Sequence, residues 1–370
     1  MKLESELSAR IFFPFALRYR RAGWAEAGSS NVSSFLPFDT SGRSGPGWKM
    51  AMLMACAVIG TLIGGGAQAQ TYPTKPIRLL VPFAPGGSSD IVSRSFAAEM
   101  QKTLGQTVIV ESKPGGAGNI AMQEAKSSAP DGYTIILGHV GTLAVNPAMF
   151  AKLPYDPVKD FIPITLLAKV PSMLVVHAEK VKAKNLKELV EWAKAHPGEL
   201  NYGSAGNGSS GHLAMAYLAL TAGFTATHVP YKGTGPMMTD MLAGRLDATF
   251  TGAPPLMAHV KAGTLRPIAV GTVKRAPAIA NVPTIAESGY AGFETSQWYG
   301  LLAPAGTSDA IVQKLAQAAA AAGKSAAVVE RLSAEAAEPS TSTPKEFADF
   351  IAVEAKRWNE VVKKSQIKAD

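Results

Sequence analysis

Three short loops carry the residues with which this chain could do chemistry. They are PGGSSD at 85–90, SAGNGSSG at 204–211 and KGTGP at 232–236, and each combines glycines with small hydroxyl or uncharged side chains. Glycine lets the backbone turn tightly and approach a ligand, and the first N–H groups of a helix have no partner within that helix. Such a loop at a helix start predicts an anion site, although its serines can equally cap the helix.

The second loop also contains a spacing that is typical of nucleotide binding. Gly206-x-Gly208-x-x-Gly211 matches the dinucleotide fingerprint, which needs an acidic residue about 20 positions further on to hold the ribose. The next strand ends instead in Pro230-Tyr231-Lys232. The loop also lacks the G-x-S-x-G order of a nucleophile elbow. We therefore expect neither a nucleotide cofactor nor a serine hydrolase.

Alternating strand and helix patterns surround these loops. Residues 77–83 and 107–112 have the composition of strands, and helical stretches follow at 91–105 and 119–128. A second series of the same kind begins at 172–177. This alternation predicts an α/β protein of two lobes, each a mainly parallel sheet flanked by helices. Because the carboxyl ends of strands in open sheets meet at one crevice, the three loops should face a ligand cleft between the lobes.

The order of the segments also predicts where one lobe gives way to the other. We expect residues 70–171 and 295–370 to form the first lobe and residues 172–294 the second. The chain would cross near 168–172 and return through FETSQWYGLLAPAG, so that these two segments form a hinge about which the lobes swing. Three helical stretches with no strand signal between them end the chain, and they are expected to pack on the first lobe.

Composition and charge narrow the class of protein. The 370 residues are 47% hydrophobic and 17% charged, which is typical of a globular chain long enough for two domains. The formal charge is +8, and residues 1–69 carry seven Lys and Arg against four Asp and Glu, so removing them leaves +5. There is no basic run interleaved with aromatic residues. The sequence therefore predicts no nucleic-acid partner.

The N-terminal 69 residues indicate export. Lys49 precedes the apolar run MAMLMACAVIGTLIGGG and then Ala67-Gln68-Ala69, which is the order of a secretory signal, here at 50–69, with cleavage after Ala69. This predicts a periplasmic protein. Residues 1–49 form an unusual extension, and Met50 is an alternative start to Met1. Cys56, the one cysteine of the chain, offers a lipoprotein alternative, but it falls in the middle of the apolar run.

The sequence gives little support for a metal site or for catalytic residues. The six histidines show no i, i+4 pairing with a carboxylate, so we expect no metal site and no cofactor. A mature chain without cysteine has no disulfide or thiolate nucleophile. No nucleophile with its base and no pair of catalytic acids can be located. We expect a binding protein, with a periplasmic hydrolase or isomerase as the competing class.

Several segments together resemble one known family. They are YPTKPIRLLVPFAPGGSSD, NPAMF, YGSAGNGSSGH, VPYKGTGPMMTDMLAGRLD and VPTIAESGY followed by WYGLLAPAGT. From Tyr72 to the C-terminus the chain is similar to the extracytoplasmic solute receptors of tripartite tricarboxylate transporters, the Bug family. The resemblance implies a periplasmic binding protein of the type II-like, Venus-flytrap kind, which closes on a small carboxylate and delivers it to membrane transporter subunits. A monomer is expected.

The resemblance also assigns ligand contacts by position. Asp90 could instead serve the first turn of a helix, Lys232 could be solvated, and His212, outside the assigned set, is better read as a packing residue. At residues 139–142 this chain has His-Val-Gly-Thr, where many relatives have a Thr-rich or Ser-rich run. The assigned contacts are Phe83, Gly86, Gly87, Ser88, Asp90, His139, Thr142 and Asn146 in the first lobe, and Ser204, Gly206, Gly208, Ser209, Tyr231, Lys232 and Gly233 in the second.

The sequence leaves the ligand and the downstream partner open. Dicarboxylates, tricarboxylates, aromatic acids and amino acids all present the carboxylate that the loops would hold. A receptor that signals to a membrane sensor, rather than to a transporter, fits the same residues.

Overall fold

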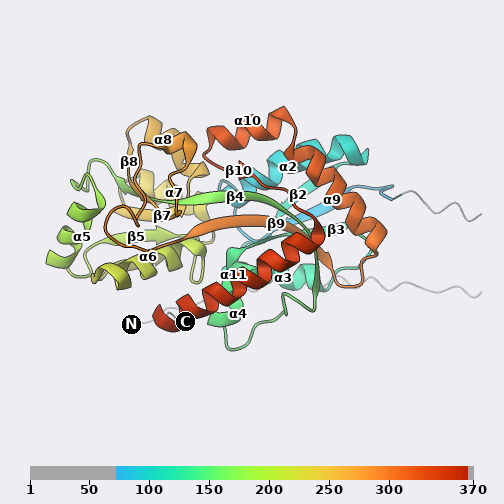
Figure 1. Cartoon of the computed structure of the whole chain (residues 1–370), viewed down its shortest axis with the longest axis horizontal. Coiled ribbons are helices and arrows are strands. Elements are labelled where there is room, and N and C mark those ends of the chain that lie inside the picture. Colours follow the sequence, from blue (N-terminus) through green and yellow to red (C-terminus); the bar gives the residue numbers. More distant parts are fainter. Residues whose placement is uncertain (1–71, 366–370) are drawn as a thin grey trace, which may run out of the picture. The chain divides into compact units, whose positions relative to one another are not determined.

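A computed structural model describes residues 72–365 of the chain. Its strands lie in the order β2-β1-β3-β9-β4-β7-β5-β6, and β8 and β10 pair with β4 beside this path. Figure 1 shows how they are arranged, with helices on both sides. The strands are β1 (Ile77–Val81), β2 (Val108–Ser112), β3 (Thr134–His139), β4 (Phe161–His177), β5 (Asn201–Ser204), β6 (Thr227–Pro230), β7 (Ala248–Gly252), β8 (Leu265–Val270), β9 (Ser296–Pro304) and β10 (Glu338–Pro339).

The strands that precede the predicted loops are parallel. β1 pairs with β2 and β3, and β5 pairs with β6 and β7, all in the parallel sense. The sequences IRLLV of β1 and TIILGH of β3 are almost wholly buried because helices cover both faces of the sheet. The helices are α2 (Ser88–Leu104), α3 (Asn119–Lys126), α4 (Asn146–Met149), α5 (Leu186–Ala195), α6 (Ser210–Ala222), α7 (Thr234–Leu242), α8 (Met257–Lys261), α9 (Asp309–Gly323), α10 (Ala326–Ala334) and α11 (Pro344–Ser365), with the short turns η1 (Gly116–Gly118), η2 (Gly141–Val145), η3 (Pro254–Leu256) and η4 (Pro277–Ile279).

Two long antiparallel strands connect the two halves of the sheet. The first part of β4 pairs with β9, from Phe161 opposite Pro304 to Pro171 opposite Ser296. Its second part, from Ser172 onward, pairs with β7 and β8. Figure 1 shows β4 and β9 side by side between the two groups of helices. Antiparallel pairing therefore occurs where the chain crosses, and parallel pairing lies on either side.

Separate hydrophobic clusters stabilise the two halves. One half buries the apolar face of α2 against β1, with Phe96 and Met100 both fully inaccessible. The other half buries Leu189 of α5 and Leu218 of α6 in a cluster with Phe250 of β7. This two-domain α/β architecture agrees with the predicted fold class. The lobe boundaries at 171/172 and 294/295 stay a prediction.

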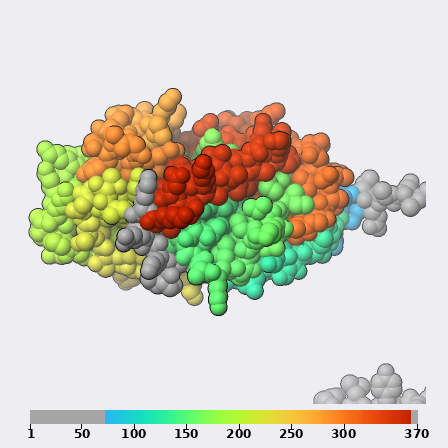
Figure 2. All heavy atoms as spheres, turned by 60° about the horizontal axis from the view of Figure 1, so that its bottom comes forward, coloured from blue at the N-terminus to red at the C-terminus, as the bar shows by residue number. Residues whose placement is uncertain are grey.

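The C-terminal helices pack on the half that contains β1. α9 contacts α2, and α11 contacts η2 and α4; Figure 2 shows α11 in red across the green segment that contains η2 and α4. The expectation of no strand among these helices was wrong, because β10 lies between α10 and α11 and pairs with β4 through Glu338 opposite Lys169. Two residues are too few to give a periodic signal.

The export signal predicted at 50–69 and the extension at 1–49 lie outside the described residues, as does Cys56. Among the described helices, none is long and apolar enough to cross a membrane.

Candidate functional site

The three predicted loops lie together in the structure. They connect β1 to α2, β5 to α6 and β6 to α7, so each ends at the first turn of a helix. The Ala84 N–H of the first loop donates to the Lys232 carbonyl of the third at 3.2 Å. A Cβ added at Gly86 would lie 3.5 Å from the Gly235 Cα. The first and third loops therefore touch through their backbones, and glycine is needed at Gly235, where a Cβ would overlap the Pro85 carbonyl oxygen.

A small cavity lies among these helix starts. Its volume is about 20 Å³, which is enough for one water molecule but not for a dicarboxylate. Helices α2, α6 and α7 contribute its walls at their N-termini, and the connecting strand β9 contributes two further side chains. The lining residues are Phe83, Ser88, Ser89, His139, Ala205, Ser209, Ser210, Gly211, Thr234, Thr251, Gln297 and Tyr299.

The chemistry of this cavity favours an anion. Hydroxyls of Ser88, Ser89, Ser210 and Thr234 stand at the starts of three helices, where backbone N–H groups have no partner within the helix. Among the lining residues of the described chain there is no arginine, lysine or carboxylate. An anion here would be held by N–H and O–H donors at the positive ends of helix dipoles rather than by an opposite charge.

His139 lines the cavity with a neutral ring that has one unused donor. The Gly141 N–H donates to its Nδ1 at 2.7 Å, so Nδ1 must be unprotonated and the hydrogen of the neutral ring lies on Nε2. Within the described chain, Nε2 is buried and has no hydrogen-bond partner. Burial lowers the pKa of His139 to about 3, and the Phe83 ring lies 4.7 Å from the imidazole between centroids. An uncharged N–H is thus available to a ligand oxygen.

Two side chains of β9 complete the polar wall. The Tyr299 hydroxyl donates to Gln297 Oε1, and both residues are at least 95% buried. Burial raises the pKa of Tyr299, so its phenol remains protonated. Neither residue could be predicted from the sequence pattern, because neither lies in a glycine loop. The one available signal was the polar Gln297 near the start of a mostly apolar strand.

A larger groove of about 660 Å³ opens beside the small cavity and shares Phe83 with it. Lys232 is the one cation of this groove within the described residues. The segment 115–118 forms a wall that sequence analysis treated as a plain connection. Yet it follows β2 and opens α3 in the same strand–glycine–helix order as the predicted loops. The lining residues are Phe83, Gly115, Gly116, Ala117, Gly118, Phe150, Ala205, Gly206, Asn207, Pro230, Tyr231, Lys232 and Pro236.

Some residues assigned by resemblance support the loops without lining either cavity. The Asp90 carboxylate accepts the Gly86 N–H at 3.1 Å and pairs with Arg94 at 2.8 Å, so it fixes the turn that precedes α2. Thr142 Oγ1 accepts the His139 N–H at 3.2 Å. Asn146 Nδ2 donates to the Ala117 carbonyl at 3.1 Å, which ties η2 and α4 to the segment 115–118.

The remaining assigned residues shape the loops that face them. Ser204 Oγ accepts the Gly206 N–H at 3.1 Å. Gly208 has a φ of +73°, and Gly233 comes so close to the first loop that a Cβ would lie 2.7 Å from the Ala84 nitrogen. A Cβ at Gly87 would likewise lie 3.1 Å from the Thr234 Cβ. Contact of these residues with a ligand stays a prediction.

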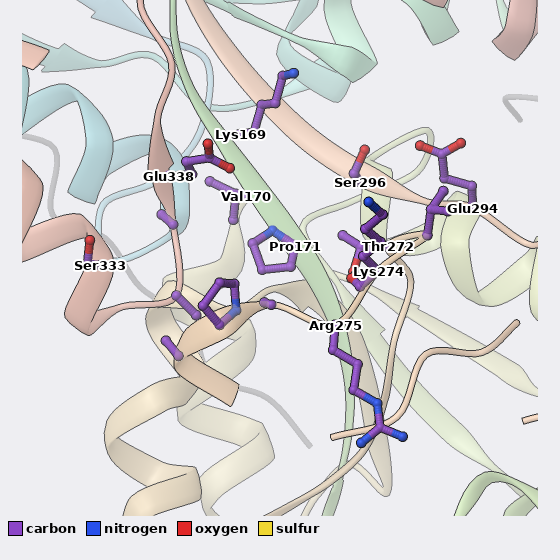
Figure 3. Close-up of a pocket in the computed structure, with 16 residues that line it drawn as sticks. Lys169, Val170, Pro171, Thr272, Lys274, Arg275, Glu294, Ser296, Ser333 and Glu338 are labelled. Atoms are coloured by element: carbon purple, nitrogen blue, oxygen red, sulfur yellow. The ribbon is translucent and has the colours of Figure 1, made fainter. Parts of the chain in front are cut away.

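A separate groove of about 570 Å³ lies over the connecting strand β4 (Figure 3). Its floor is formed by Lys169, Val170 and Pro171, and its walls come from the segment 272–278 and from residues 333–338. No residue assigned as a ligand contact lines it. The groove therefore differs in both position and composition from the cavity at the helix starts.

Comparisons with known proteins find relatives of this chain. The model of the tripartite tricarboxylate transporter family receptor matches residues 92–367. Protein BugT of Bordetella pertussis is 36% identical over 325 residues, 86% of this chain and 99% of its own. The structure of R. palustris Rpa4515 with adipate has a TM-score of 0.78 and 36% identity, covering 80% of this chain and 99% of that one. MatC of Rhodopseudomonas palustris with bound malate has a TM-score of 0.76 and 34% identity, covering 79% and 100%.

Proposed function

Because this chain belongs to the tripartite tricarboxylate transporter receptor family, we propose that it captures a small carboxylate and delivers it to the membrane subunits of such a transporter. The observation that carries the proposal is the convergence of three helix starts, with their hydroxyls, on one cavity without a fixed charge among its lining residues. The relatives solved with adipate and malate support a carboxylate as the ligand class. The export of the chain to the periplasm, after cleavage behind Ala69, is part of the same proposal.

The ligand carboxylate would be held by backbone N–H groups at the starts of α2, α6 and α7. Ser88 and Ser209 would add hydroxyl contacts, and His139 would donate from Nε2. Lys232 lies in the adjoining groove, where the body or a second carboxylate of the ligand would extend. Specificity among carboxylates would then arise in the groove, and the carboxylate itself would be recognised in the cavity.

Binding requires the two halves to separate and close again. The cavity of about 20 Å³ has no room for a dicarboxylate in this arrangement, so the ligand must enter when its walls stand apart. A ligand that touches the loops on both sides gains its full set of contacts only on closure, and this difference in contacts shifts the population toward the closed form. β4 and β9, which connect the halves, would bend. No covalent step is needed.

Thermal denaturation of the mature chain, residues 70–370, tests the proposal. The panel contains malate, adipate, citrate, benzoate and glutamate. NAD and ATP are the negative controls. A ligand at 100 times its Kd adds about 2.7 kcal/mol to the free energy of unfolding, which raises Tm by roughly 5 °C in a chain of this size. A saturable shift with a carboxylate supports the proposal. A shift with NAD or ATP alone would refute it.

Uptake measurements separate delivery from sensing. Cells that lack this protein should lose uptake of the carboxylate that it binds, and cells that lack the transporter membrane subunits should lose it equally. Unchanged uptake in the first strain, together with a lost transcriptional response to the same carboxylate, would instead establish a signalling receptor.

A further inference from the structure

A column of three aromatic rings lies directly behind the loop Ser204–Gly211. Tyr202 of β5 stacks on His228 of β6, with ring centroids 5.0 Å apart. His228 in turn stacks on His212 of α6, with centroids 4.1 Å apart and planes only 10° from parallel. Neither histidine lines the cavity at the helix starts or the groove beside it. Their effect on a ligand would pass through the loop, to which both rings are hydrogen-bonded.

Both imidazoles are hydrogen-bonded to this loop. His228 Nε2 lies 2.7 Å from Ser204 Oγ, which also accepts the Gly206 N–H at 3.1 Å. His212 Nδ1 accepts the Gly208 N–H at 3.1 Å, and the His212 N–H donates to Ser209 Oγ at 3.4 Å. The stacked pair thus holds the loop near its beginning and near its end. Gly206 and Gly208, at φ of +124° and +73°, turn the backbone between these two points.

The arrangement requires uncharged rings. A His212 Nδ1 that accepts an N–H cannot carry a hydrogen of its own. Two imidazolium ions at 4.1 Å between centroids would repel each other in a partly buried site. Burial, and secondly the charge of His212, lower the pKa of His228 to about 4. The groups that face His228 are Tyr202 and Ser204 on β5 and His212 on α6.

We propose that His212 and His228 are positioning residues, whose stacked neutral rings hold the loop Ser204–Gly211 in the conformation that lines the cavity at the helix starts. This proposal rests on the proposed function, because the conformation of the loop affects ligand binding only if the loop contacts the carboxylate. Protonation of the pair breaks the bond from Gly208 and separates the rings, so the loop loses its shape. Ligand affinity then depends on two residues that do not touch the ligand.

Hydrogen exchange of the ligand-free mature protein tests the proposal without any ligand. His228→Phe keeps a ring between Tyr202 and His212 but removes the nitrogen that meets Ser204. We expect amide exchange in a peptide covering 204–211 to rise at least about tenfold, because local opening becomes easier. His196→Phe is the matched control, since His196 also stacks on an aromatic ring, that of Trp192, and follows the last residue of α5, outside the loop. Unchanged exchange in His228→Phe would overturn the proposal.

A pH titration of the unmodified protein by NMR gives a second measurement, which holds even where the variant fails to fold. We expect the amide signals of Gly206 and Gly208 to move with the same midpoint as the His228 ring, well below 6.5. Amide midpoints that differ from the midpoint of the His228 ring would contradict the proposal. Because neither readout contains a carboxylate, failure of the proposed function would appear separately, as absence of ligand-induced stabilisation.

Discussion

Replacing Gly208 by valine should remove ligand binding while the protein stays folded. Gly208 has a φ of +73°, and a Cβ there would lie 3.5 Å from the Ala117 Cβ and 3.6 Å from Asn146 Oδ1. The Cβ alone therefore meets ordinary contacts, but the two additional methyl groups of valine must enter the space between the loops. They would compete with the ligand for that space and prevent full closure.

The cost in stability follows from the backbone. A β-branched residue at positive φ is strained by roughly 1–2 kcal/mol, which lowers Tm by several degrees in a chain of this size. Gly263→Val is the matched control, because Gly263 has a φ of +77° and an added Cβ meets no atom within 4 Å. Gly263 lines neither the small cavity nor the groove beside it. Both variants should lose similar stability, and Gly208→Val alone should lose affinity.

Calorimetry with the carboxylate that most stabilises the wild-type protein supplies the assay. We expect no measurable heat of binding for Gly208→Val and a Kd within about threefold of the wild-type value for Gly263→Val, a difference of under 1 kcal/mol. Wild-type affinity in Gly208→Val, or an equal loss of affinity in Gly263→Val, would show that the space beside Gly208 does not control binding.

Three further predictions follow from the structure. Lys232→Met should weaken binding by about fivefold, or roughly 1 kcal/mol, because Lys232 is a groove residue and solvent screens its charge; complete loss of binding in calorimetry would show that charge recognises the ligand. Because the pKa of His139 is lowered from 6.5 to about 3, its contribution to the free energy of unfolding is full above pH 6.5 and falls by roughly 1.4 kcal/mol per pH unit between pH 6.5 and 3. Urea titrations at pH 7 and 5 would detect this loss, and His139→Gln should remove this part of the pH dependence. The protein recovered from the periplasm should begin at Gln70, and N-terminal sequencing that finds a lipid-bearing Cys56 or residues 1–49 would disprove the signal assignment.

The sequence was most informative where chemistry and backbone geometry coincide. Ser88 and Ser209 could be identified because glycines precede them at the ends of strands, and both line the small cavity. The same pattern was present at PGGAG, residues 114–118, but with no hydroxyl in that loop it was not recognised as a wall of the groove. A glycine loop can contribute shape without contributing side-chain donors.

The connecting strand illustrates a different limit. The sequence predicted a strand at 172–177, whereas β4 runs from Phe161 to His177. The pairing of β4 with β9 shifts between Pro163 and Thr165 and again between Leu166 and Ala168. Each shift breaks the alternation of buried and exposed side chains by which a strand is predicted from a sequence. The prolines within the run are also unfavourable to the prediction of a strand. Gln297 and Tyr299 on the partner strand were missed for a related reason, since only tertiary pairing brings them to the cavity.

A crystal structure of the mature protein with the carboxylate that gives the largest thermal shift tests the central claim most directly. We expect the carboxylate oxygens at hydrogen-bond distance, about 3 Å, from N–H groups or hydroxyls at the starts of α2, α6 and α7, with His139 Nε2 as a neutral donor. A ligand with no carboxylate at these helix starts, held instead by a lysine or arginine such as Lys274 in the groove over β4, would contradict the account.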